Sequence, residues 1–259
     1  MIESIQNSKV KWARALQRRR ERQREGKLFV EGVRLVGDAV ATGITPDLLF
    51  FTQAALETAR VQSLVEAHGP VAWEVSEAVM TEMAGTVTPQ GVAAIVPLPA
   101  LPWPEQPTLL LIADGVRDPG NLGTLLRSAA AAGVEGVIVP RGTVDPWADK
   151  VLRAGMGAHF RLPIYEGLTW DAVLSLLTGL TVRLGDAQGD ALYDQVDWTL
   201  PSALIIGGEA SGAGEAARQR TDEIITISMA NAVESLNAAV AGSVMMFEAF
   251  RQRRMEPSG

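Results

Sequence analysis

The chain has 259 residues, a formal net charge of −7 and an apolar fraction of 47%, which suffices for two modest domains or one large one. It contains no cysteine, so disulfides, thiolate metal sites and cysteine nucleophiles are excluded. No stretch approaches the roughly 18 uninterrupted apolar residues of a membrane span, and the N-terminus is polar and then strongly basic. We therefore expect a cytoplasmic protein with no membrane contact.

Basic residues gather at the N-terminal end, although the chain as a whole is acidic. Val10, Ala13 and Leu16 recur there at helical spacing, which predicts one helix with a narrow apolar seam and a charged remainder. Because phosphate binding relies on Lys and Arg, this end is a candidate surface for a polyanion. A plain solvated helix face is the alternative. The candidate phosphate contacts are Lys11, Arg14, Arg18, Arg19 and Arg22.

The first hundred residues predict a small mixed α/β domain that ends at a proline-rich segment. Apolar runs at 28–30, 48–51 and 92–96 are separated by helical patterns around 33–42 and 54–67. Prolines at 99, 102 and 104 favour a semi-rigid linker, because proline interrupts helices and sheet ladders. We therefore predict a first domain over residues 1–97, a linker over 98–106 and a second domain over 107–259.

The second domain alternates short apolar runs with helical patterns, which predicts a mostly parallel sheet covered by helices. The last helix is expected from Val233 to about Arg251, with one apolar face that packs on the sheet or on a partner. The members of that face are Leu236, Val240, Val244, Phe247 and Phe250. The strand candidates are 109–113, 136–139, 181–184, 203–206 and 224–227.

Parallel sheets bind ligands beyond the carboxyl ends of their strands, and the turn after the first of these strands is unusual. Residues 118–120 read Asp-Pro-Gly, which is turn chemistry, and Asn121 is a good helix N-cap. A simple strand-to-helix connection accounts for Asn121. It does not account for Arg127, an arginine on an otherwise apolar helix, which either reaches solvent or points at a ligand.

Two later turns also have unusual composition. Residues 207–214 are glycine-rich, so the backbone there can approach a ligand closely. This loop lacks the ending of a phosphate-binding P-loop, and no dinucleotide fingerprint follows the first strand, which argues against NTP hydrolysis and NAD chemistry. The turn after the fifth strand carries Ser235 and Asn237, which are polar where a ligand would sit but also suit caps and turns.

Together, these three segments resemble the motifs of the SpoU family of RNA 2′-O-ribose methyltransferases, within the SPOUT superfamily. The first motif covers residues 118–123 with Arg127, the second covers 207–212, and the third covers 227–237. The sequence departs from the family pattern at Ala210, where glycine is common, and at Ser228, where proline is common. Segments 4–16, 29–32 and 89–92 resemble the family's RNA-binding domain, which is similar in fold to a small ribosomal protein.

The resemblance implies an α/β chain with a small N-terminal RNA-binding domain and a parallel-sheet methyltransferase domain that ends in a trefoil knot. It implies methyl transfer from S-adenosylmethionine to a ribose 2′-hydroxyl of structured RNA. Ribosomal RNA is favoured over transfer RNA, and an inactive RNA-binding or ribosome-assembly protein is the alternative from another class. It also implies a homodimer through the C-terminal domain, with active sites that are commonly completed from both subunits.

The resemblance also implies roles for individual residues. Arg127 is expected beside the target ribose as a fixed cation, since a guanidinium stays protonated and is a poor general base. Asn121, Glu209, Ser235 and Asn237 form the expected polar frame, with Glu209 as the ion-pair partner of Arg127. No metal is expected, because His68 and His159 lack ligand partners at suitable spacing. The expected cofactor contacts are Gly207, Gly208, Ile227, Leu236, Met229 and Val139, and the five basic residues named above are the expected RNA contacts.

Overall fold

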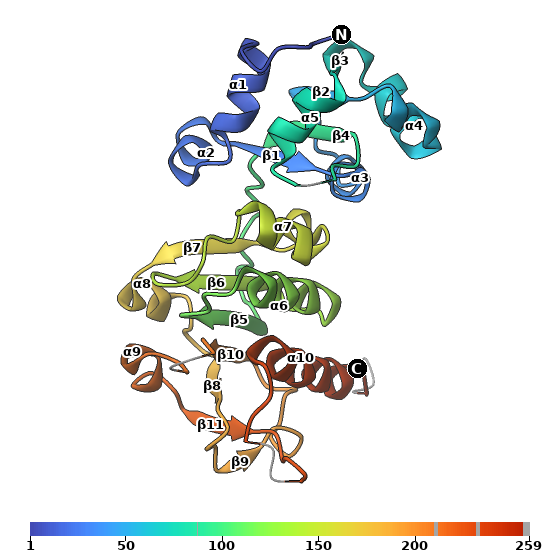
Figure 1. Cartoon of the computed structure of the whole chain (residues 1–259). Coiled ribbons are helices and arrows are strands. Elements are labelled where there is room, and N and C mark those ends of the chain that lie inside the picture. Colours follow the sequence, from blue (N-terminus) through green and yellow to red (C-terminus); the bar gives the residue numbers. More distant parts are fainter. Residues whose placement is uncertain (87, 210–211, 232–233, 256–259) are drawn as a thin grey trace. The chain divides into compact units, whose positions relative to one another are not determined.

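The computed structural model of the chain describes residues 1–86, 88–209, 212–231 and 234–255 (Figure 1). Ala210 and Val233, which the sequence analysis singles out, lie outside these ranges. The chain divides into two compact units, Met1–Ala100 with Trp147–Phe160, and Leu101–Pro146 with Arg161–Gly259. The change of unit after Ala100 falls inside the predicted linker, and Trp147–Phe160, which the sequence pattern assigns to the second domain, belongs to the first unit.

The first unit contains a four-stranded sheet in the order β1-β4-β2-β3. Strand β4 pairs antiparallel with β1 and β2, whereas β2 and β3 are parallel. The sequence pattern does not predict β3 or α5. In chain order the elements are α1 (Ser8–Ala15), α2 (Arg19–Glu25), β1 (Lys27–Glu31), α3 (Val33–Ala41), β2 (Leu48–Phe51), η1 (Ala54–Glu57), α4 (Ala59–Ala67), η2 (Gly69–Val71), β3 (Ala72–Glu74), α5 (Glu77–Ala84), β4 (Val92–Pro97), α7 (Asp149–Gly155) and η3 (Ala158–Phe160).

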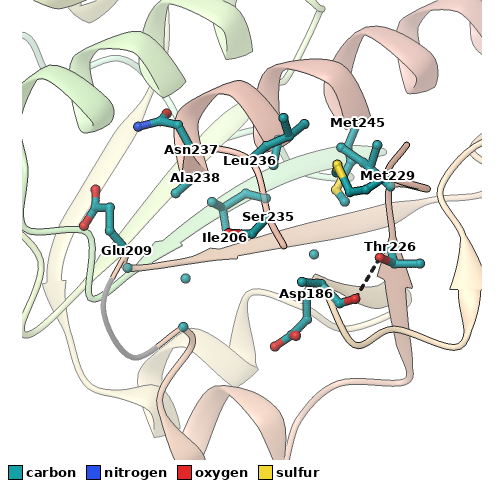
Figure 2. Close-up of a pocket in the computed structure, with 17 residues that line it drawn as sticks. Asp186, Ile206, Glu209, Thr226, Met229, Ser235, Leu236, Asn237, Ala238 and Met245 are labelled. Carbon is teal, nitrogen blue, oxygen red and sulfur yellow. Dashed lines mark hydrogen bonds between the residues drawn. The ribbon is translucent and has the colours of Figure 1, made fainter. Parts of the chain in front are cut away.

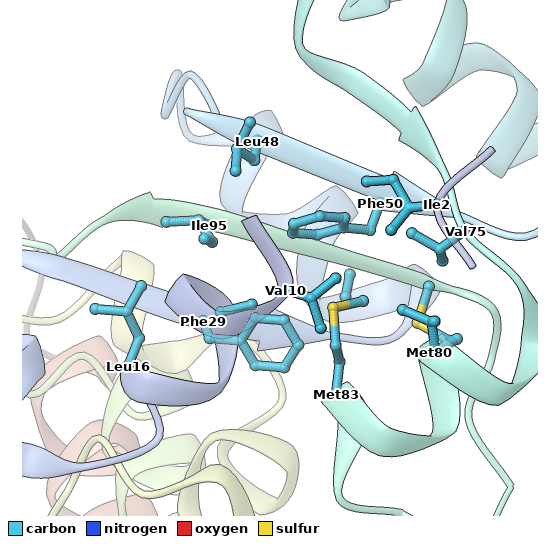
Figure 3. Packing of buried hydrophobic residues seen from close by; sticks show 13 residues of the cluster. Ile2, Val10, Leu16, Phe29, Leu48, Phe50, Val75, Met80, Met83 and Ile95 are labelled. Carbon is cyan, nitrogen blue, oxygen red and sulfur yellow. The ribbon is translucent and has the colours of Figure 1, made fainter. Parts of the chain in front are cut away.

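The core of this unit lies between the sheet and helices α1 and α5, as Figure 3 shows. Val10 on α1, Phe50 on β2 and Met83 on α5 are fully buried in it. The apolar seam that the sequence predicts for the N-terminal segment therefore packs on this sheet. The segment is two helices, not the single helix expected, because Arg18 has extended backbone (φ −90°, ψ 129°) between α1 and α2.

The second unit is built on a seven-stranded sheet in the order β7-β6-β5-β10-β8-β11-β9, and every strand pair in its described residues is parallel. The predicted parallel-sheet domain is thus confirmed. The elements are β5 (Leu109–Asp114), α6 (Pro119–Ala131), β6 (Gly136–Pro140), β7 (Ile164–Leu168), α8 (Trp170–Ser175), β8 (Thr181–Gly185), β9 (Ala191–Leu192), β10 (Ser202–Gly207), α9 (Glu215–Arg218), β11 (Glu223–Thr226) and α10 (Ala238–Met255).

Helices cover both faces of this sheet, which explains why its central strands β5 and β10 are buried at every position. Ile112 and Ile205 pack with Val173 of α8 and Ala217 of α9. On the other face, Ile206 contacts α10, where a Cβ at Gly242 would approach its side chain to 3.0 Å. The trefoil knot stays a prediction, because strand order and pairing do not describe how the chain threads.

The last helix, α10, begins at Ala238, so Leu236 of the predicted apolar face lies before it. The helix meets the sheet through other residues, which leaves a partner as the predicted alternative for that face. Small residues and methionines are buried, whereas Val240, Phe247 and Phe250 are 47%, 46% and 37% exposed. The predicted apolar face therefore does not pack on the sheet. The buried residues of α10 are Ala239, Gly242, Met245, Met246 and Ala249. No helix in the described part of the chain combines the length and hydropathy that a bilayer span needs.

Candidate active site at the carboxyl ends of the strands

A pocket of about 460 Å³ lies at the carboxyl ends of β8, β10 and β11 (Figure 2). Its volume is in the range typical of small-molecule sites. Figure 2 shows Glu209 and Asn237 toward one end and Asp186 and Thr226 toward the other. The lining residues are Gly185, Asp186, Ala187, Ile206, Gly207, Gly208, Glu209, Gly212, Thr226, Ile227, Met229, Ser235, Leu236, Asn237, Ala238, Ala241 and Met245.

The structure brings five of the six expected cofactor contacts to this pocket, namely Gly207, Gly208, Ile227, Met229 and Leu236. The expectation for the sixth is corrected. Val139 is 2% exposed on β6, and β5 separates that strand from β10. An apolar strand residue in the sheet interior packs under helices whether or not it adjoins a ligand, so its hydrophobicity carries no information about the pocket.

The glycines of the second motif are required by close backbone packing. A Cβ at Gly208 would lie 2.2 Å from the carbonyl oxygen of Gly115, and one at Gly207 would lie 2.1 Å from the backbone nitrogen of Ala213. Real Cβ atoms do not approach other atoms so closely, so neither site accepts a side chain without backbone movement. The loop that begins at Gly207 is therefore pressed against the turn that follows β5.

A chain of hydrogen bonds joins the three motifs at one end of the pocket. The Asn121 side-chain amide donates to Glu209 Oε1 (2.5 Å), and Asn237 Nδ2 donates to Asn121 Oδ1 (3.0 Å). Asn237 Oδ1 also accepts from the backbone N–H groups of Ala239 and Val240 at the start of α10. Asn237 is thus both a helix cap and a member of the polar cluster.

Asn121 is free for this role because it is not the helix cap that its sequence suggests. The N-cap of α6 is Asp118, whose Oδ1 accepts from the Asn121 backbone N–H (2.8 Å), and Pro119 occupies the first helical position. Proline is well suited there, because the first N–H of a helix has no intrahelical partner. The Asn121 side chain consequently projects from the first turn toward Glu209.

Arg127 lies away from this cluster, and it forms no ion pair with Glu209 of the same chain. Arg127 is exposed and makes no hydrogen bond or ion pair with the residues that the structure describes. It follows Asn121 by six residues on the same helix, which corresponds to about 9 Å along the axis and about 240° of rotation. It does not line the pocket, whereas Ser235 does.

The charged groups that the described residues bring to the pocket lining are carboxylates. None of the described lining residues is a Lys, Arg or His, and the two acidic ones are Asp186 and Glu209. Burial raises the pKa of Asp186, but hydrogen bonds from the Gln188 backbone and the Arg218 guanidinium outweigh it and hold that pKa below its ordinary value. Because Arg218 also compensates the charge of Asp186, Glu209 is the carboxylate through which the pocket favours a positively charged ligand.

Sequence reasoning missed the part of the lining that follows β8. Asp186 and Ala187 lie directly after the third strand candidate, and the rule that ligands bind beyond strand ends pointed there as much as to the other turns. The Thr226 hydroxyl donates to the Ala187 carbonyl (3.3 Å) across this side of the pocket. Asp186 and Ala187 do not stand in a conspicuous glycine or proline turn. Their position at the end of a strand was therefore the signal in the sequence that could have placed them at the pocket.

The basic residues of the first unit differ in accessibility. Lys11, Arg14, Arg18 and Arg19 are exposed. Arg22 is 3% exposed and donates to the Leu16 and Gln17 carbonyls at 3.1 and 2.8 Å. The expectation that Arg22 contacts RNA is therefore corrected, because its guanidinium satisfies carbonyls in the turn after α1. No metal-binding group of three or more His, Cys, Asp or Glu occurs among the described residues.

Comparisons with known proteins agree on the family of both parts. Residues 108–247 match the SpoU rRNA Methylase family, and residues 7–94 match the MRM3-like substrate binding domain. The mouse protein named rRNA methyltransferase 3, mitochondrial, is 33% identical over 91% of this chain and 70% of its own length. The Bacillus subtilis protein named 23S rRNA (guanosine(2553)-2'-O)-methyltransferase RlmP is 33% identical, covering 95% of this chain and 97% of that protein.

A solved structure extends the match over nearly the whole length of the chain. A crystal structure of an AdoMet-bound rRNA methyltransferase from Sinorhizobium meliloti has a TM-score of 0.82 and 32% sequence identity, covering 99% of this chain and 98% of that one. The family model spans more than half of the chain, and the relatives align along nearly all of it. The chain belongs to the SpoU rRNA methylase family.

Proposed function

We propose that the chain transfers a methyl group from S-adenosylmethionine to a ribose 2′-hydroxyl of ribosomal RNA. The observation that carries this proposal is the hydrogen-bonded cluster of Asn121, Glu209 and Asn237 beside a glycine-walled, carboxylate-bearing pocket. Each member comes from a different family motif. Relatives whose names state rRNA methylation, and a structure described as AdoMet-bound, support the substrate and the cofactor.

The lining residues suit the cofactor in surface type and in charge. Gly207 and Gly208 offer bare backbone, and Ile227, Met229 and Leu236 offer apolar surface. When bound, S-adenosylmethionine supplies an electrophilic methyl group on a positively charged sulfonium. The carboxylates in the lining match that positive charge, and the absence of Lys, Arg and His among the described lining residues avoids repulsion.

The polar residues orient the ribose and stabilise the charge that develops on its oxygen. Methyl transfer needs an in-line approach, and positioning of this kind contributes up to about 7–11 kcal/mol in ideal cases. The guanidinium of Arg127 provides a cation for the developing alkoxide and stays protonated throughout. The proton of the hydroxyl leaves to phosphate or water.

A second copy of the chain completes the site in this proposal. Arg127 is outside the pocket of its own chain, whereas an exposed apolar surface begins at the pocket residue Leu236, which is 36% exposed and lies just before α10. Val240, Phe247 and Phe250 continue the same surface. Pairing through α10 would bury this surface and bring the partner's Arg127 to the pocket.

The first unit supplies contacts to the RNA backbone. Lys11, Arg14, Arg18 and Arg19 present exposed positive charge that is suited to phosphate. Ribosomal RNA is the favoured substrate because this unit matches the MRM3-like substrate binding domain and the relatives that cover most of the chain are named rRNA methyltransferases. We place the protein in the cytoplasm, where bacterial ribosomal RNA is modified. The alternative is a mitochondrial location, which the mouse relative's name states for that protein. Cell fractionation would distinguish the two locations.

The direct test supplies S-adenosylmethionine with a radiolabelled methyl group to the purified chain together with ribosomal RNA, assembled subunits or transfer RNA. Nuclease digestion and chromatography then identify the labelled nucleoside. The proposal expects a 2′-O-methylated nucleoside from ribosomal RNA or subunits. Label in transfer RNA alone would reassign the substrate, and binding of RNA without transfer of label would favour an inactive assembly protein.

A further inference from the structure

A buried carboxylate lies at the end of β5, just outside the pocket and outside the residues assigned above. Asp114 is 6% exposed. Its Oδ2 accepts from the backbone N–H of Gly214 (2.8 Å), and its Oδ1 accepts from the indole N–H of Trp170 (3.1 Å). One side chain thus connects the strand before the first motif to the end of the second-motif loop and to helix α8.

The backbone on both sides of Asp114 is also fixed. The Thr143 hydroxyl donates to the Ala113 carbonyl (2.8 Å) and accepts from the Gly115 N–H (2.9 Å). Gly115 in turn packs its carbonyl against Gly208, leaving no room for a Cβ there. The carboxylate therefore projects from a rigid strand end, so it can hold the loop in one place.

The loop that Asp114 holds forms one wall of the pocket. Gly208 and Gly212 exchange backbone hydrogen bonds (3.2 and 3.0 Å), which join these two pocket residues. Beyond that bridge, the bond from Gly214 to Asp114 is the side-chain attachment that ties the loop to β5. The wall residues Gly207, Gly208, Glu209 and Gly212 all precede this attachment.

We propose that Asp114 is a positioning residue for the cofactor: its carboxylate anchors Gly214, and thereby holds the pocket residues Gly208 and Gly212 where they bind S-adenosylmethionine. The inference rests on the proposed function for the identity of the ligand. Asp114 does not line the pocket and acts through the Gly214 backbone.

A carboxylate is needed because two N–H donors approach its two oxygens. An asparagine has the same shape but offers one acceptor oxygen and one NH₂ donor. In Asp114→Asn, the NH₂ group must face either Gly214 N–H or Trp170 Nε1–H, and a donor left unsatisfied in a buried site is costly. Replacing Trp170 by Phe removes one of the two donors, so the asparagine oxygen can then serve Gly214 alone.

The experiment compares four proteins, the wild type, Asp114→Asn, Trp170→Phe and the double variant, by calorimetry with S-adenosylmethionine. We expect Asp114→Asn to weaken binding about tenfold, as removal of one buried hydrogen bond predicts. Trp170→Phe should bind within about threefold of the wild type, since it keeps the Gly214 bond. The double variant should bind S-adenosylmethionine as tightly as Trp170→Phe does. If Asp114→Asn weakened binding only by destabilising the whole protein, the second substitution would not restore the affinity.

Hydrogen–deuterium exchange without cofactor provides a second readout of the same four proteins. The peptide that contains Gly214 should exchange faster in Asp114→Asn and return to slow exchange in the double variant. Wild-type affinity in Asp114→Asn, or a double variant no tighter than Asp114→Asn, would overturn the inference. A wild type that binds no S-adenosylmethionine would instead overturn the proposed function, while the exchange data would still show whether Asp114 holds the loop.

Discussion

At the scale of single residues, the proposed reaction depends most on Arg127, which is exposed and has no hydrogen-bond or ion-pair partner among the described residues. We predict that Arg127→Ala binds S-adenosylmethionine as the wild type does but lowers methyl transfer about 10²–10³-fold, the reduction typical of removing one group that stabilises developing charge. Arg127→Lys should also be slow, because an ammonium does not reproduce the planar guanidinium. Single-turnover kinetics with bound RNA measures both; wild-type rates in Arg127→Ala would refute the assignment.

A second residue-scale prediction concerns Glu31, a 7% exposed carboxyl at the end of β1. Burial raises its pKa, and the nearby Asp149 adds to this, while the backbone N–H of Gln90 and Arg153 oppose it. Because the folded state binds this proton more tightly than the unfolded state, the free energy of unfolding falls as the pH rises from the ordinary pKa of Glu through the raised pKa of the folded state.

We therefore predict that Glu31→Gln is more stable than the wild type at pH 7, and that the difference disappears in acid, below the ordinary pKa of Glu near 4.3. The glutamine keeps an oxygen that can accept from Gln90. Thermal unfolding across pH values measures the effect, with the exposed Glu57→Gln as the matched control. A Glu31→Gln variant that is less stable at pH 7 would show that the ionised carboxylate is stabilising.

Sequence could predict which residue types form the site but not how each side chain is used. Asn121, Glu209 and Asn237 follow from the motifs, and the structure joins them by hydrogen bonds. Arg22 looks like its exposed neighbours in a basic run, yet it is buried because α2 folds back on the carbonyls after α1. That interaction depends on the chain bend at Arg18, which helical periodicity does not encode.

At the scale of elements, the glycine-rich loop after β10 depends on backbone contact with the turn after β5. We predict that Gly208→Ala destabilises the protein by about 1–3 kcal/mol, as overpacking does, and weakens binding of S-adenosylmethionine. The reason is the 2.2 Å approach of the added Cβ to the Gly115 carbonyl. Gly69→Ala is the control, because a Cβ there meets nothing within 4 Å. Equal affinities and stabilities for the two variants would contradict the prediction.

The basic helices of the first unit give a prediction about RNA. We predict that Lys11→Glu with Arg18→Glu weakens RNA binding and reduces the slope of log affinity against log salt by about 0.7–0.9 for each phosphate that the protein no longer neutralises. Affinity for S-adenosylmethionine should stay unchanged. Filter binding over a salt series provides the measurement, with Arg34→Glu and Arg60→Glu on α3 and α4 as a charge-matched control. An unaltered slope would mean that the basic helices are only a solvated surface.

Periodicity identified the long apolar elements and missed the short edge strands. The run that forms β5 is buried at every position, so its apolar sequence predicted a strand directly. Strand β7 includes Tyr165, which is 39% exposed, and Glu166, so it lacks the apolar run of an interior strand. Strand β9 has two residues, which is too short for any alternation. Edge strands are defined by pairing with a neighbour, and a single sequence does not record that pairing.

At the scale of the whole molecule, we predict a homodimer through the exposed apolar surface of α10. An obligate interface of this kind buries more than about 2,000 Å² in total, so the dimer should persist at low micromolar concentration. Sedimentation equilibrium should give twice the 27.6 kDa mass of one chain. Val240→Asp with Phe247→Asp should give monomers that no longer transfer methyl groups. A fully active monomer would refute both the dimer and the shared site.

The central claim is that the chain methylates ribosomal RNA on a ribose 2′-hydroxyl. The most direct measurement is a map of ribose methylation in ribosomal and transfer RNA from cells that lack the gene, complemented with the wild type or with Arg127→Ala. We predict that methylation at a ribosomal position disappears without the gene, returns with the wild type and does not return with Arg127→Ala. Identical maps in all three strains would contradict the claim.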